Sequence, residues 1–295
     1  MSVAALVLIF VAALAHASWN LLSKQASAAG GTAFIWLVAV VATVAYAPVA
    51  AAGAILARPH LTVMSWVFMA GTGLLQAGYF LFLNHGYRIG DLSLVYPIGR
   101  GTGALLAALA GIVLLGERPG LVSIAGILAI VAGIVLIGLP GRAGAASPAS
   151  PAGSPRLRAI AFALVTGGFI AAYTLWDKYA VTTLRTPAIL QGYAAFPVMV
   201  AVLAVHARRS PRRLSQVWQP FRRQVIGTAV LTPLAYMLVL VALSFTAVST
   251  VAPAREVSVL FGVLLGRRLL GEGGLPRKLA AAAAIVAGIV AVAVG

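Results

Sequence analysis

The chain has 295 residues, of which 62% are hydrophobic and only 9% are charged. A soluble domain carries roughly 25% charged residues, so this composition excludes an ordinary water-soluble fold and indicates a membrane protein. Cysteine is absent from the sequence, which excludes disulfides and thiolate chemistry, and basic membrane loops explain the net charge of +16 better than nucleic acid does.

Apolar residues gather in blocks of about 20 residues, the length that crosses a bilayer as a helix. The runs are long and continuous, which favours helices over barrel strands, because barrel strands alternate between apolar and polar residues. We therefore predict an all-α membrane protein with ten transmembrane helices, at residues 3–22, 33–55, 62–83, 92–115, 121–139, 159–180, 187–206, 225–245, 249–266 and 279–294.

Basic residues are distributed unevenly between the expected loops. Of the 21 Lys and Arg residues, 15 lie in odd-numbered loops and 4 in even-numbered loops, whereas Arg100 and Arg255 lie inside spans. Cytoplasmic loops of membrane proteins are enriched in Lys and Arg, so the odd-numbered loops are expected in the cytoplasm. We predict a multi-pass protein of a bacterial inner membrane with both termini outside.

Segment 140–158 is rich in Pro, Ala, Ser and Gly, a composition typical of a flexible linker. It separates a first half at residues 1–139 from a second half at residues 159–295. Each half contains five of the expected spans. We therefore predict two domains of similar size joined by this linker.

The two halves resemble each other in sequence. A shift of 155 residues brings Arg100 onto Arg255 and the letters "LLGE" onto a second "LLGE". Near the start of each half, a shift of 157 brings Trp19 onto Trp176. Because each half has an odd number of spans, the second half would enter the membrane upside down relative to the first. Inverted repeats of this kind are the architecture of many secondary transporters.

Three segments carry a resemblance to a known family: "HASWNLLSK" at 16–24, "SLVYPIGRGTGALLAALAGIVLLGERP" at 93–119 and "STVAPAREVSVLFGVLLGRRLLGE" at 249–272. The chain resembles the drug/metabolite transporter superfamily, in its ten-span EamA-like branch, whose pattern has a Pro early in spans 4 and 9 and Gly-Glu at their ends. The resemblance covers nearly the whole chain and implies two EamA-like five-helix repeats and a carrier role. Members of this family move amino acids, other metabolites, sugars or drugs. An arginine in both copies is not a general family feature, so no family site transfers to it.

Arg100 and Arg255 interrupt otherwise apolar spans, where a guanidinium costs at least ~2.5 kcal/mol. A planar guanidinium suits carboxylate or phosphate, so we predict that both residues bind an anionic group of a substrate. Because the halves are inverted, we expect them to bracket a central cavity from opposite sides. The alternative is structural, in which each arginine pairs with a protein carboxylate or with carbonyls freed by Pro97 and Pro253.

Glu256 is the one acid well inside an expected span, and it has no counterpart because Gly101 occupies its repeat position. We predict that Glu256 carries a coupling proton; an ion pair with Arg100 is the alternative. Glu117 and Glu272 lie at span ends and are expected to be structural anchors.

Further substrate-binding candidates are Tyr96 in span 4, His16, Trp19 and Asn20 in span 1, and Trp176, the repeat equivalent of Trp19. A cavity lined by an aromatic ring, an amide and an imidazole suits a small polar metabolite. Single polar residues in helix bundles also serve helix contacts, which is the alternative. Weaker candidates for lining the cavity are Gln76, Tyr79, Gln191, Tyr193 and Tyr236.

The sequence contains no P-loop, HExxH or G-x-S-x-G motif, so we expect no enzymatic activity, no cofactor and no metal. The prediction is a secondary active transporter that exports a small anionic or zwitterionic metabolite, such as an amino acid, by alternating access. Its expected partners are the substrate, the lipid bilayer and protons as the candidate coupling ion, in a monomer or weak homodimer. The alternatives are a multidrug or cation carrier, which the arginines disfavour, and a flippase of a lipid-linked sugar.

Overall fold

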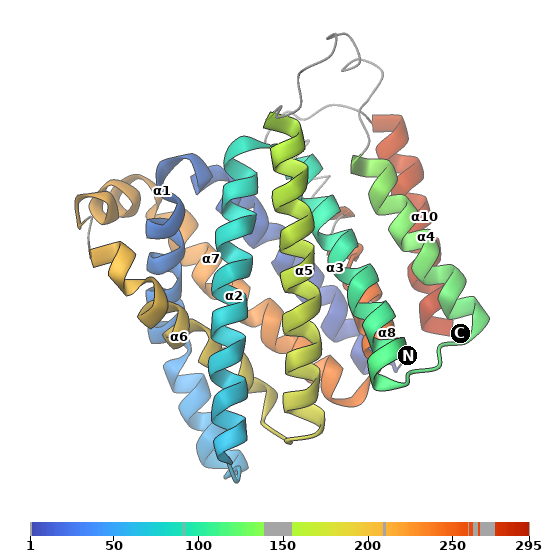
Figure 1. The fold of residues 1–295 in the computed structure, drawn as a ribbon, viewed down its shortest axis with the longest axis horizontal. Coiled ribbons are helices and arrows are strands. Elements are labelled where there is room, and N and C mark those ends of the chain that lie inside the picture. The colour runs from blue at the N-terminus through green and yellow to red at the C-terminus, as the bar shows by residue number, and fades with distance from the viewer. Residues whose placement is uncertain are drawn as a thin grey trace.

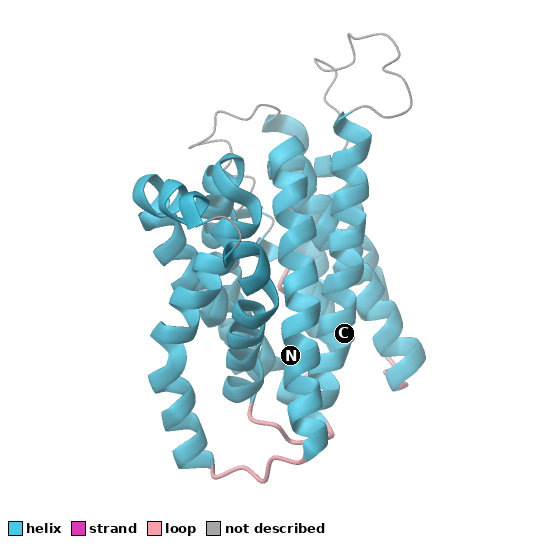
Figure 2. Ribbon diagram, turned by 60° about the vertical axis from the view of Figure 1, so that its left-hand side comes forward, coloured by secondary structure: helices cyan, strands magenta, loops and turns pink. Residues whose placement is uncertain are grey.

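The computed structural model describes residues 2–90, 92–138, 155–208, 211–258, 260–261, 265 and 275–294. Within these ranges the regular elements are α-helices and no strand is present. Figures 1 and 2 show the described helices side by side in a bundle. Most of the expected linker, residues 140–154, lies outside the described residues. Its last four residues are instead the start of a helix, because Pro155 occupies a first helical position, where a proline is well tolerated.

The first half contains four helical elements: α1 (Val3–Ala57), α2 (Val63–Ile89), α3 (Leu92–Leu115) and α4 (Leu121–Gly138). The first two expected spans are joined in α1, which bends at Gly31, where φ is 39° and ψ is −108°. A positive φ is readily adopted by glycine because it has no Cβ. The chain therefore changes direction at Gly31, and the loop expected around Lys24 is helical instead.

The second half contains α5 (Pro155–Thr182), α6 (Ala188–Arg208), α7 (Pro211–Phe245), α8 (Val248–Ala254) and α10 (Leu275–Val294). The ninth expected span is discontinuous, since α8 ends at Ala254 and a turn at Arg255 and Glu256 precedes further helical residues. Pro253 has no N–H to continue the helical ladder. After Pro253, the Glu256 N–H donates to the Pro253 carbonyl at 2.9 Å, three residues back instead of the four of an α-helix, so the chain turns more tightly here.

Seven helical segments in the described part of the chain are long and apolar enough to cross a membrane. Two of them are the parts of α1 on either side of its bend, Val3–Ala26 and Gly31–Ala57. Shorter apolar stretches occur in α4 and α10. The lengths and compositions support a multi-pass membrane protein, and a total of ten spans stays a prediction.

Helices of the two halves are interleaved in the bundle. The most extensive contacts are those of α1 with α7, α4 with α10 and α3 with α5, and each joins one half to the other (Figure 1). The buried core accordingly draws residues from both halves. Neither half buries its apolar surface alone, so the two are expected to fold as one unit.

Two lysines secure corresponding helix ends. Lys24 donates to the carbonyls of Tyr87 and Gly90 at 2.8 Å, at the end of α2. Lys178 donates to the carbonyls of Leu243 and Thr246 at 2.9 Å, at the end of α7. A cation is favourable at a helix C-terminus, because the last carbonyls carry partial negative charge and lack intrahelical partners. Figure 1 places these two helix ends at opposite ends of the bundle.

Glu117 has the structural role expected of it. Its two carboxylate oxygens accept the backbone N–H groups of Val248 and Ser249, both at 2.8 Å, at the first turn of α8. An anion at a helix N-terminus satisfies free N–H groups and complements the helix dipole. Glu117 and Lys178 therefore hold both sides of the short turn between α7 and α8. Glu272, the repeat equivalent of Glu117, lies outside the described residues.

Small residues allow the closest helix approaches. A Cβ added to Gly126 of α4 would lie 2.6 Å from the carbonyl oxygen of Gly288 in α10, and the reverse distance is also 2.6 Å. Gly103 of α3 likewise faces Ile170 of α5, whose nearest carbon would lie 2.6 Å from a Cβ added to Gly103. Close backbone packing of this kind stabilises helix pairs in membranes, where lipid removes the hydrophobic driving force.

We predict that Gly126→Val separates α4 from α10 and destabilises the protein by ~1–3 kcal/mol, the usual cost of overpacking. The matched control is Ala125→Val, which adds volume to the adjacent, exposed position of the same helix. Thermal unfolding of both detergent-purified variants is the measurement. Equal melting temperatures for the two variants would show that the contact between α4 and α10 is not tightly packed.

Candidate functional site

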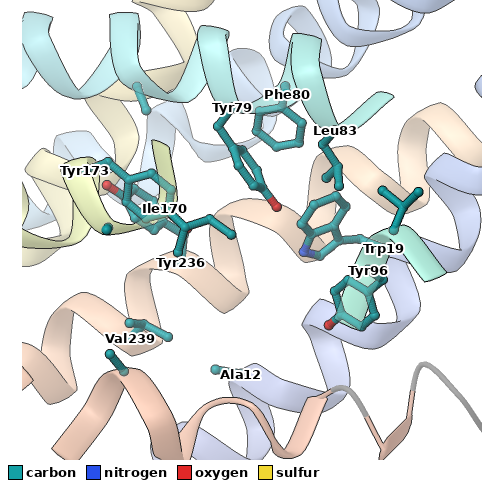
Figure 3. Close-up of a cluster of buried hydrophobic side chains, with 14 of the residues drawn as sticks. Ala12, Trp19, Tyr79, Phe80, Leu83, Tyr96, Ile170, Tyr173, Tyr236 and Val239 are labelled. Atoms are coloured by element: carbon teal, nitrogen blue, oxygen red, sulfur yellow. The ribbon is translucent and has the colours of Figure 1, made fainter. Parts of the chain in front are cut away.

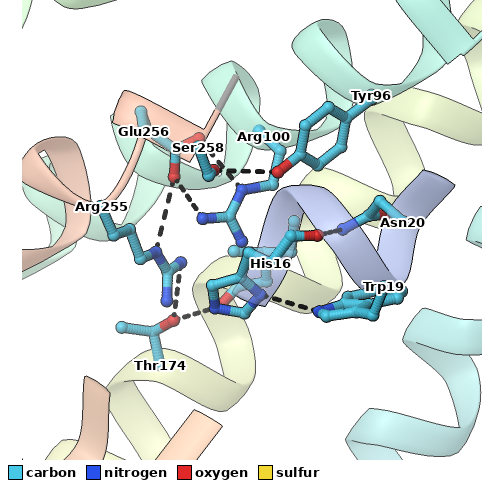
Figure 4. Close-up of polar contacts among 10 residues, drawn as sticks. His16, Trp19, Asn20, Tyr96, Arg100, Thr174, Arg255, Glu256 and Ser258 are labelled. Atoms are coloured by element: carbon cyan, nitrogen blue, oxygen red, sulfur yellow. Dashed lines mark hydrogen bonds and ion pairs between the residues drawn. The ribbon is translucent and has the colours of Figure 1, made fainter. Parts of the chain in front are cut away.

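Arg100 of α3 forms a buried ion pair with Glu256, which lies in the break of the ninth expected span. The Nε of Arg100 donates to Glu256 Oε2 at 3.0 Å, and its Nη2 lies 2.9 Å from Oε1 (Figure 4). The exposed fractions of the two side chains are 2% and 0%. The side-on fork of the guanidinium thus faces both carboxylate oxygens, a geometry that favours strong charge-assisted contacts.

A second contact joins the same two segments. Tyr96, one helical turn before Arg100, donates its hydroxyl hydrogen to Ser258 Oγ at 2.9 Å. Tyr96 and Ser258 are both buried. The predicted candidates Tyr96 and Arg100 therefore share one face of α3 and fix the residues just after the break.

Arg255 lies beside the same carboxylate. Its Nε is 3.5 Å from Glu256 Oε1, and its Nη2 donates to Thr174 Oγ1 of α5 at 3.3 Å (Figure 4). We refer to Arg100, Arg255 and Glu256 as the arginine cluster. The repeat led us to expect that the two arginines bracket a cavity from opposite sides. In this structure they converge on one carboxylate instead. The physical reason is the turn after Pro253, which brings neighbouring side chains of the broken span together.

The hydrogen-bonding capacity of Arg255 is only partly used in the described part of the chain. A guanidinium has five N–H donors. The contact of Arg255 with Thr174 is its one side-chain hydrogen bond among the described residues, and its buried Nε has no hydrogen-bond partner. The cluster also carries two positive charges and one negative charge. It therefore offers both spare donors and excess positive charge inside an apolar bundle.

His16 lies beside the arginine cluster, within electrostatic range of both arginines (Figure 4). Its Nδ1 accepts a hydrogen bond from Trp19 Nε1 at 3.0 Å. In a neutral imidazole whose Nδ1 is an acceptor, the other nitrogen, Nε2, carries the hydrogen. The contact with Trp19 thus orients the ring and leaves an N–H donor on its other edge.

Trp19 and Asn20 are tied into contacts with α2. Trp19 is 1% exposed and its ring meets those of Tyr79 and Phe80. Asn20 donates to the His16 carbonyl at 2.7 Å and accepts from the Tyr87 hydroxyl at 2.6 Å. The amide of Asn20 is therefore engaged by protein groups on both sides. Through its contact with Tyr79, Trp19 also lies at one end of a row of tyrosines.

The tyrosine row consists of Tyr79, Tyr173 and Tyr236, whose rings are in edge-to-face contact across the bundle (Figure 3). Tyr79 meets Trp19 at a centroid distance of 6.5 Å and Tyr173 at 5.7 Å, and Tyr173 meets Tyr236 at 5.9 Å. Each ring contributes a largely buried apolar body with one polar group. The row places aromatic and hydroxyl groups next to the arginine cluster.

Trp176, the repeat equivalent of Trp19, lies elsewhere. Its Nε1 donates to the Phe68 carbonyl at 2.8 Å, and its ring stacks on Phe68 with centroids 4.1 Å apart. The ring of Tyr179 also stacks on Phe68. The structure therefore brings Arg100, Arg255, Glu256, His16, Trp19 and Tyr96 together and leaves Trp176 in a contact between α5 and α2.

Thr174 and Ser258 were not predicted, although both contact the cluster. Each is a small hydroxyl residue in a helix, and nothing in the sequence distinguishes them from ordinary helix-packing residues. Within the described ranges, no group of three or more His, Cys, Asp or Glu residues is arranged to hold a metal ion.

Comparison with known proteins gives a consistent assignment. The model of the EamA-like transporter family matches residues 3–139 and 157–294, one match for each half. The chain belongs to the EamA-like transporter family. It is therefore a multi-pass membrane transporter of the drug/metabolite transporter superfamily, as the sequence resemblance implied.

A solved structure described only as "Crystal structure of protein" has a similar fold. The match has a TM-score of 0.72 at 17% sequence identity and covers 100% of this chain and 98% of that chain. At this identity the likeness concerns the fold alone. None of the curated proteins compared with the chain matches it.

The geometry of the arginine cluster predicts an order of stability among its variants. Glu256→Met leaves two buried guanidinium groups without a counter-charge, whereas Arg100→Met leaves Glu256 beside Arg255. Removing one partner of a buried pair costs ~3–5 kcal/mol. We therefore expect Glu256→Met to lower the melting temperature of the detergent-purified protein more than Arg100→Met does.

The Arg100→Met/Glu256→Met double variant completes the cycle. It still contains Arg255, so we expect it to be more stable than Glu256→Met alone but less stable than the wild type. Strictly additive losses in melting temperature would mean that Arg100 and Glu256 do not interact.

Proposed function

We propose that the protein is a secondary active exporter of a small anionic or zwitterionic metabolite, such as an amino acid, and works by alternating access. The observation that carries this proposal is the excess positive charge of the arginine cluster. Two guanidinium groups face one carboxylate at nearly zero exposure. A substrate with an anionic group would supply the missing negative charge.

Arg255 is the proposed first contact of that anionic group. Burying an ion costs several kcal/mol unless it is paired and hydrogen-bonded. Arg100 is paired with Glu256 through contacts of 3.0 and 2.9 Å, whereas the ion pair of Arg255 is longer, at 3.5 Å. Among the described residues, each arginine has one buried nitrogen without a hydrogen-bond partner, Nη2 in Arg100 and Nε in Arg255, and the weaker ion pair makes Arg255 the more available of the two. A carboxylate bound side-on to Arg255 would satisfy donors that the protein leaves unused.

The broken span supports an alternating-access mechanism. Transporter sites are typically formed by discontinuous helices, because irregular backbone near a cavity can bind solutes and change shape. Here the break falls at Arg255 and Glu256, within the cluster itself. In the proposed cycle the substrate anion competes with Glu256 for Arg255, so that binding loosens the contact between α3 and the broken span.

Neighbouring groups fit the same class of substrate. His16 would present its Nε2–H group to the solute, and the Tyr96 hydroxyl, which donates to Ser258, could still accept a hydrogen bond from it. Trp19 and the tyrosine row would contact the apolar part of the solute. Trp176 and Asn20, proposed from the sequence, are already engaged by protein groups. Glu256 as the coupling residue stays a prediction.

The cellular setting remains part of the proposal. We propose that the protein lies in a bacterial inner membrane, and the distribution of basic residues favours an orientation with both termini outside. It is proposed to act as a monomer or weak homodimer. A multidrug or cation carrier is the main competing function, followed by a flippase of a lipid-linked sugar. Excess positive charge at the site would repel a cation, so the two leading classes predict opposite behaviour towards charged probes.

Transport by reconstituted protein tests the proposal. We expect proteoliposomes to exchange L-glutamate or L-leucine across the membrane and not to transport ethidium. Arg255→Ala should weaken the apparent affinity roughly 10- to 150-fold, because a charged hydrogen bond is worth ~1.5–3 kcal/mol. Arg255→Lys should recover only part of this loss, because lysine keeps the charge and lacks the fork.

The matched control is Arg222→Ala, which removes an exposed arginine of α7. It should leave exchange unchanged. Ethidium transport without amino-acid exchange would establish the cation-carrier alternative. Unchanged affinity in a folded Arg255→Ala variant would remove the arginine cluster from the binding site.

A further inference from the structure

A second polar cluster surrounds Asp177 of α5, on the far side of the tyrosine row from Trp19. The exposed fraction of Asp177 is 0%. Its Oδ1 accepts from Thr72 Oγ1 of α2 at 2.5 Å and from Gln191 Nε2 of α6 at 3.0 Å. Its Oδ2 accepts from the Tyr236 hydroxyl of α7. Helices α2, α5, α6 and α7 therefore all contribute to the environment of one carboxyl group.

All three donors to Asp177 are neutral. Within the described part of the chain, no Lys, Arg or His forms an ion pair with it, and the ion pairs that are present there belong to Glu256. Lys178 is adjacent in sequence but points to the carbonyls at the end of α7. A buried charge is normally paired, so a carboxyl group held only by neutral donors is suited to exist in both a charged and a neutral form.

The titratable groups that face Asp177 from the helices packed on α5 are few. Tyr236 of α7 touches it, and Tyr173 and Tyr79 follow in the tyrosine row. The contacts from α2 and α6 come from Thr72 and Gln191, which do not titrate. Arg100 of α3 and Arg255 after α8 are held by Glu256 in the arginine cluster. Among the described residues, Asp177 is therefore the one carboxyl group of the second polar cluster, and Glu256 belongs to the arginine cluster.

One hydrogen-bond acceptor in the same cluster has no donor. Gln191 is fully buried, and its Oε1 lacks a hydrogen-bond partner while its Nε2 bonds to both Asp177 and Thr72. A protonated Asp177 has one O–H donor. If the Gln191 amide rotates, this O–H can bond to Oε1, so one added proton supplies the donor that the network lacks.

The position of Asp177 connects it to the arginine cluster. Thr174, which accepts a hydrogen bond from Arg255, lies three residues earlier on α5. Residues three apart on a helix are neighbours on one face, with Cβ atoms about 5–6 Å apart. A change at Asp177 can thus reach Arg255 through one turn of α5.

We propose that Asp177 is the proton-binding site of this protein and couples proton movement to transport. This deepens the proposed function and rests on it, and it assigns to Asp177 the role that the sequence favoured for Glu256. When Asp177 takes up a proton, the hydrogen bonds from Thr72, Gln191 and Tyr236 rearrange. The rearrangement moves α5 relative to α2, α6 and α7 and shifts the contact between Thr174 and Arg255.

Infrared difference spectroscopy tests proton binding directly, with the proton itself as the probe. The chain has only five Asp and Glu side chains, so a carboxyl band can be assigned by substitution. Acidifying the detergent-purified wild type should produce a protonated-carboxyl band that is absent from Asp177→Asn. The matched controls Glu256→Gln and Glu117→Gln should keep it. A band that persists in Asp177→Asn and disappears in Glu256→Gln would overturn the proposal.

Tyr236→Phe gives a second test that does not depend on whether Asp177→Asn folds. It keeps the carboxyl group but removes a donor that stabilises its charged form, so the band should appear at a higher pH than in the wild type. An unchanged midpoint would show that the band does not come from Asp177.

A transport measurement separates this inference from the proposed function. In proteoliposomes preloaded with L-glutamate or L-leucine, Asp177→Asn should retain exchange. In proteoliposomes without internal substrate, it should lose the accumulation that a pH gradient drives. Exchange by the wild type with full pH-driven accumulation by Asp177→Asn would refute coupling through Asp177 while leaving the transporter assignment intact. Absence of any exchange by the wild type would instead refute the proposed substrate class, and the infrared result would still decide proton binding.

Discussion

The organisation of this protein depends on how two buried arginines are compensated inside an apolar helix bundle. Arg100 and Arg255 share one carboxylate, Glu256, and each of the three side chains is at most 2% exposed. A charge in such a place is costly, so the helices must bring its partners to it with good geometry. The break after Pro253, the close packing of α3 on α5 and the hydroxyl of Thr174 all serve this requirement.

The ends of the helices make that arrangement possible. Glu117 and Lys178 hold the two sides of the turn between α7 and α8, so that α8 is short but fixed where it begins. In the proposed cycle, the broken span changes shape near Arg255 while its start stays held by Glu117. The tyrosine row connects the arginine cluster with the cluster around Asp177, so the bundle contains one site with excess positive charge and one with an acidic group.

Much of the fold could be predicted from the sequence, because apolar runs of the right length report helices directly. The α3 helix, at Leu92–Leu115, has the bounds that its apolar block predicted. The bend at Gly31 and the helical start at Pro155 could not be foreseen, since both segments were interpreted as loops from composition. The resemblance to the family was also readable, from the repeated Pro and Gly-Glu positions.

Part of the site could also be predicted. The mere presence of arginine in an apolar run indicates a partner or a ligand, and the pairing of Arg100 with Glu256 was among the alternatives considered. The convergence of both arginines on one carboxylate could not be predicted, because regular helix geometry places residues 255 and 256 on different faces. Thr174 carries no signal beyond that of any threonine in a helix, and Asp177 gains its meaning only from the neutral residues that three other helices bring to it.

An experimental structure of the protein with a transported amino acid bound tests the central claim most directly. The account predicts that the carboxylate of the solute lies within hydrogen-bonding distance of the Arg255 guanidinium, with Glu256 displaced from Arg255. A solute bound away from an unchanged arginine cluster would contradict it, and the two arginines would then serve only to hold α3 against the broken span.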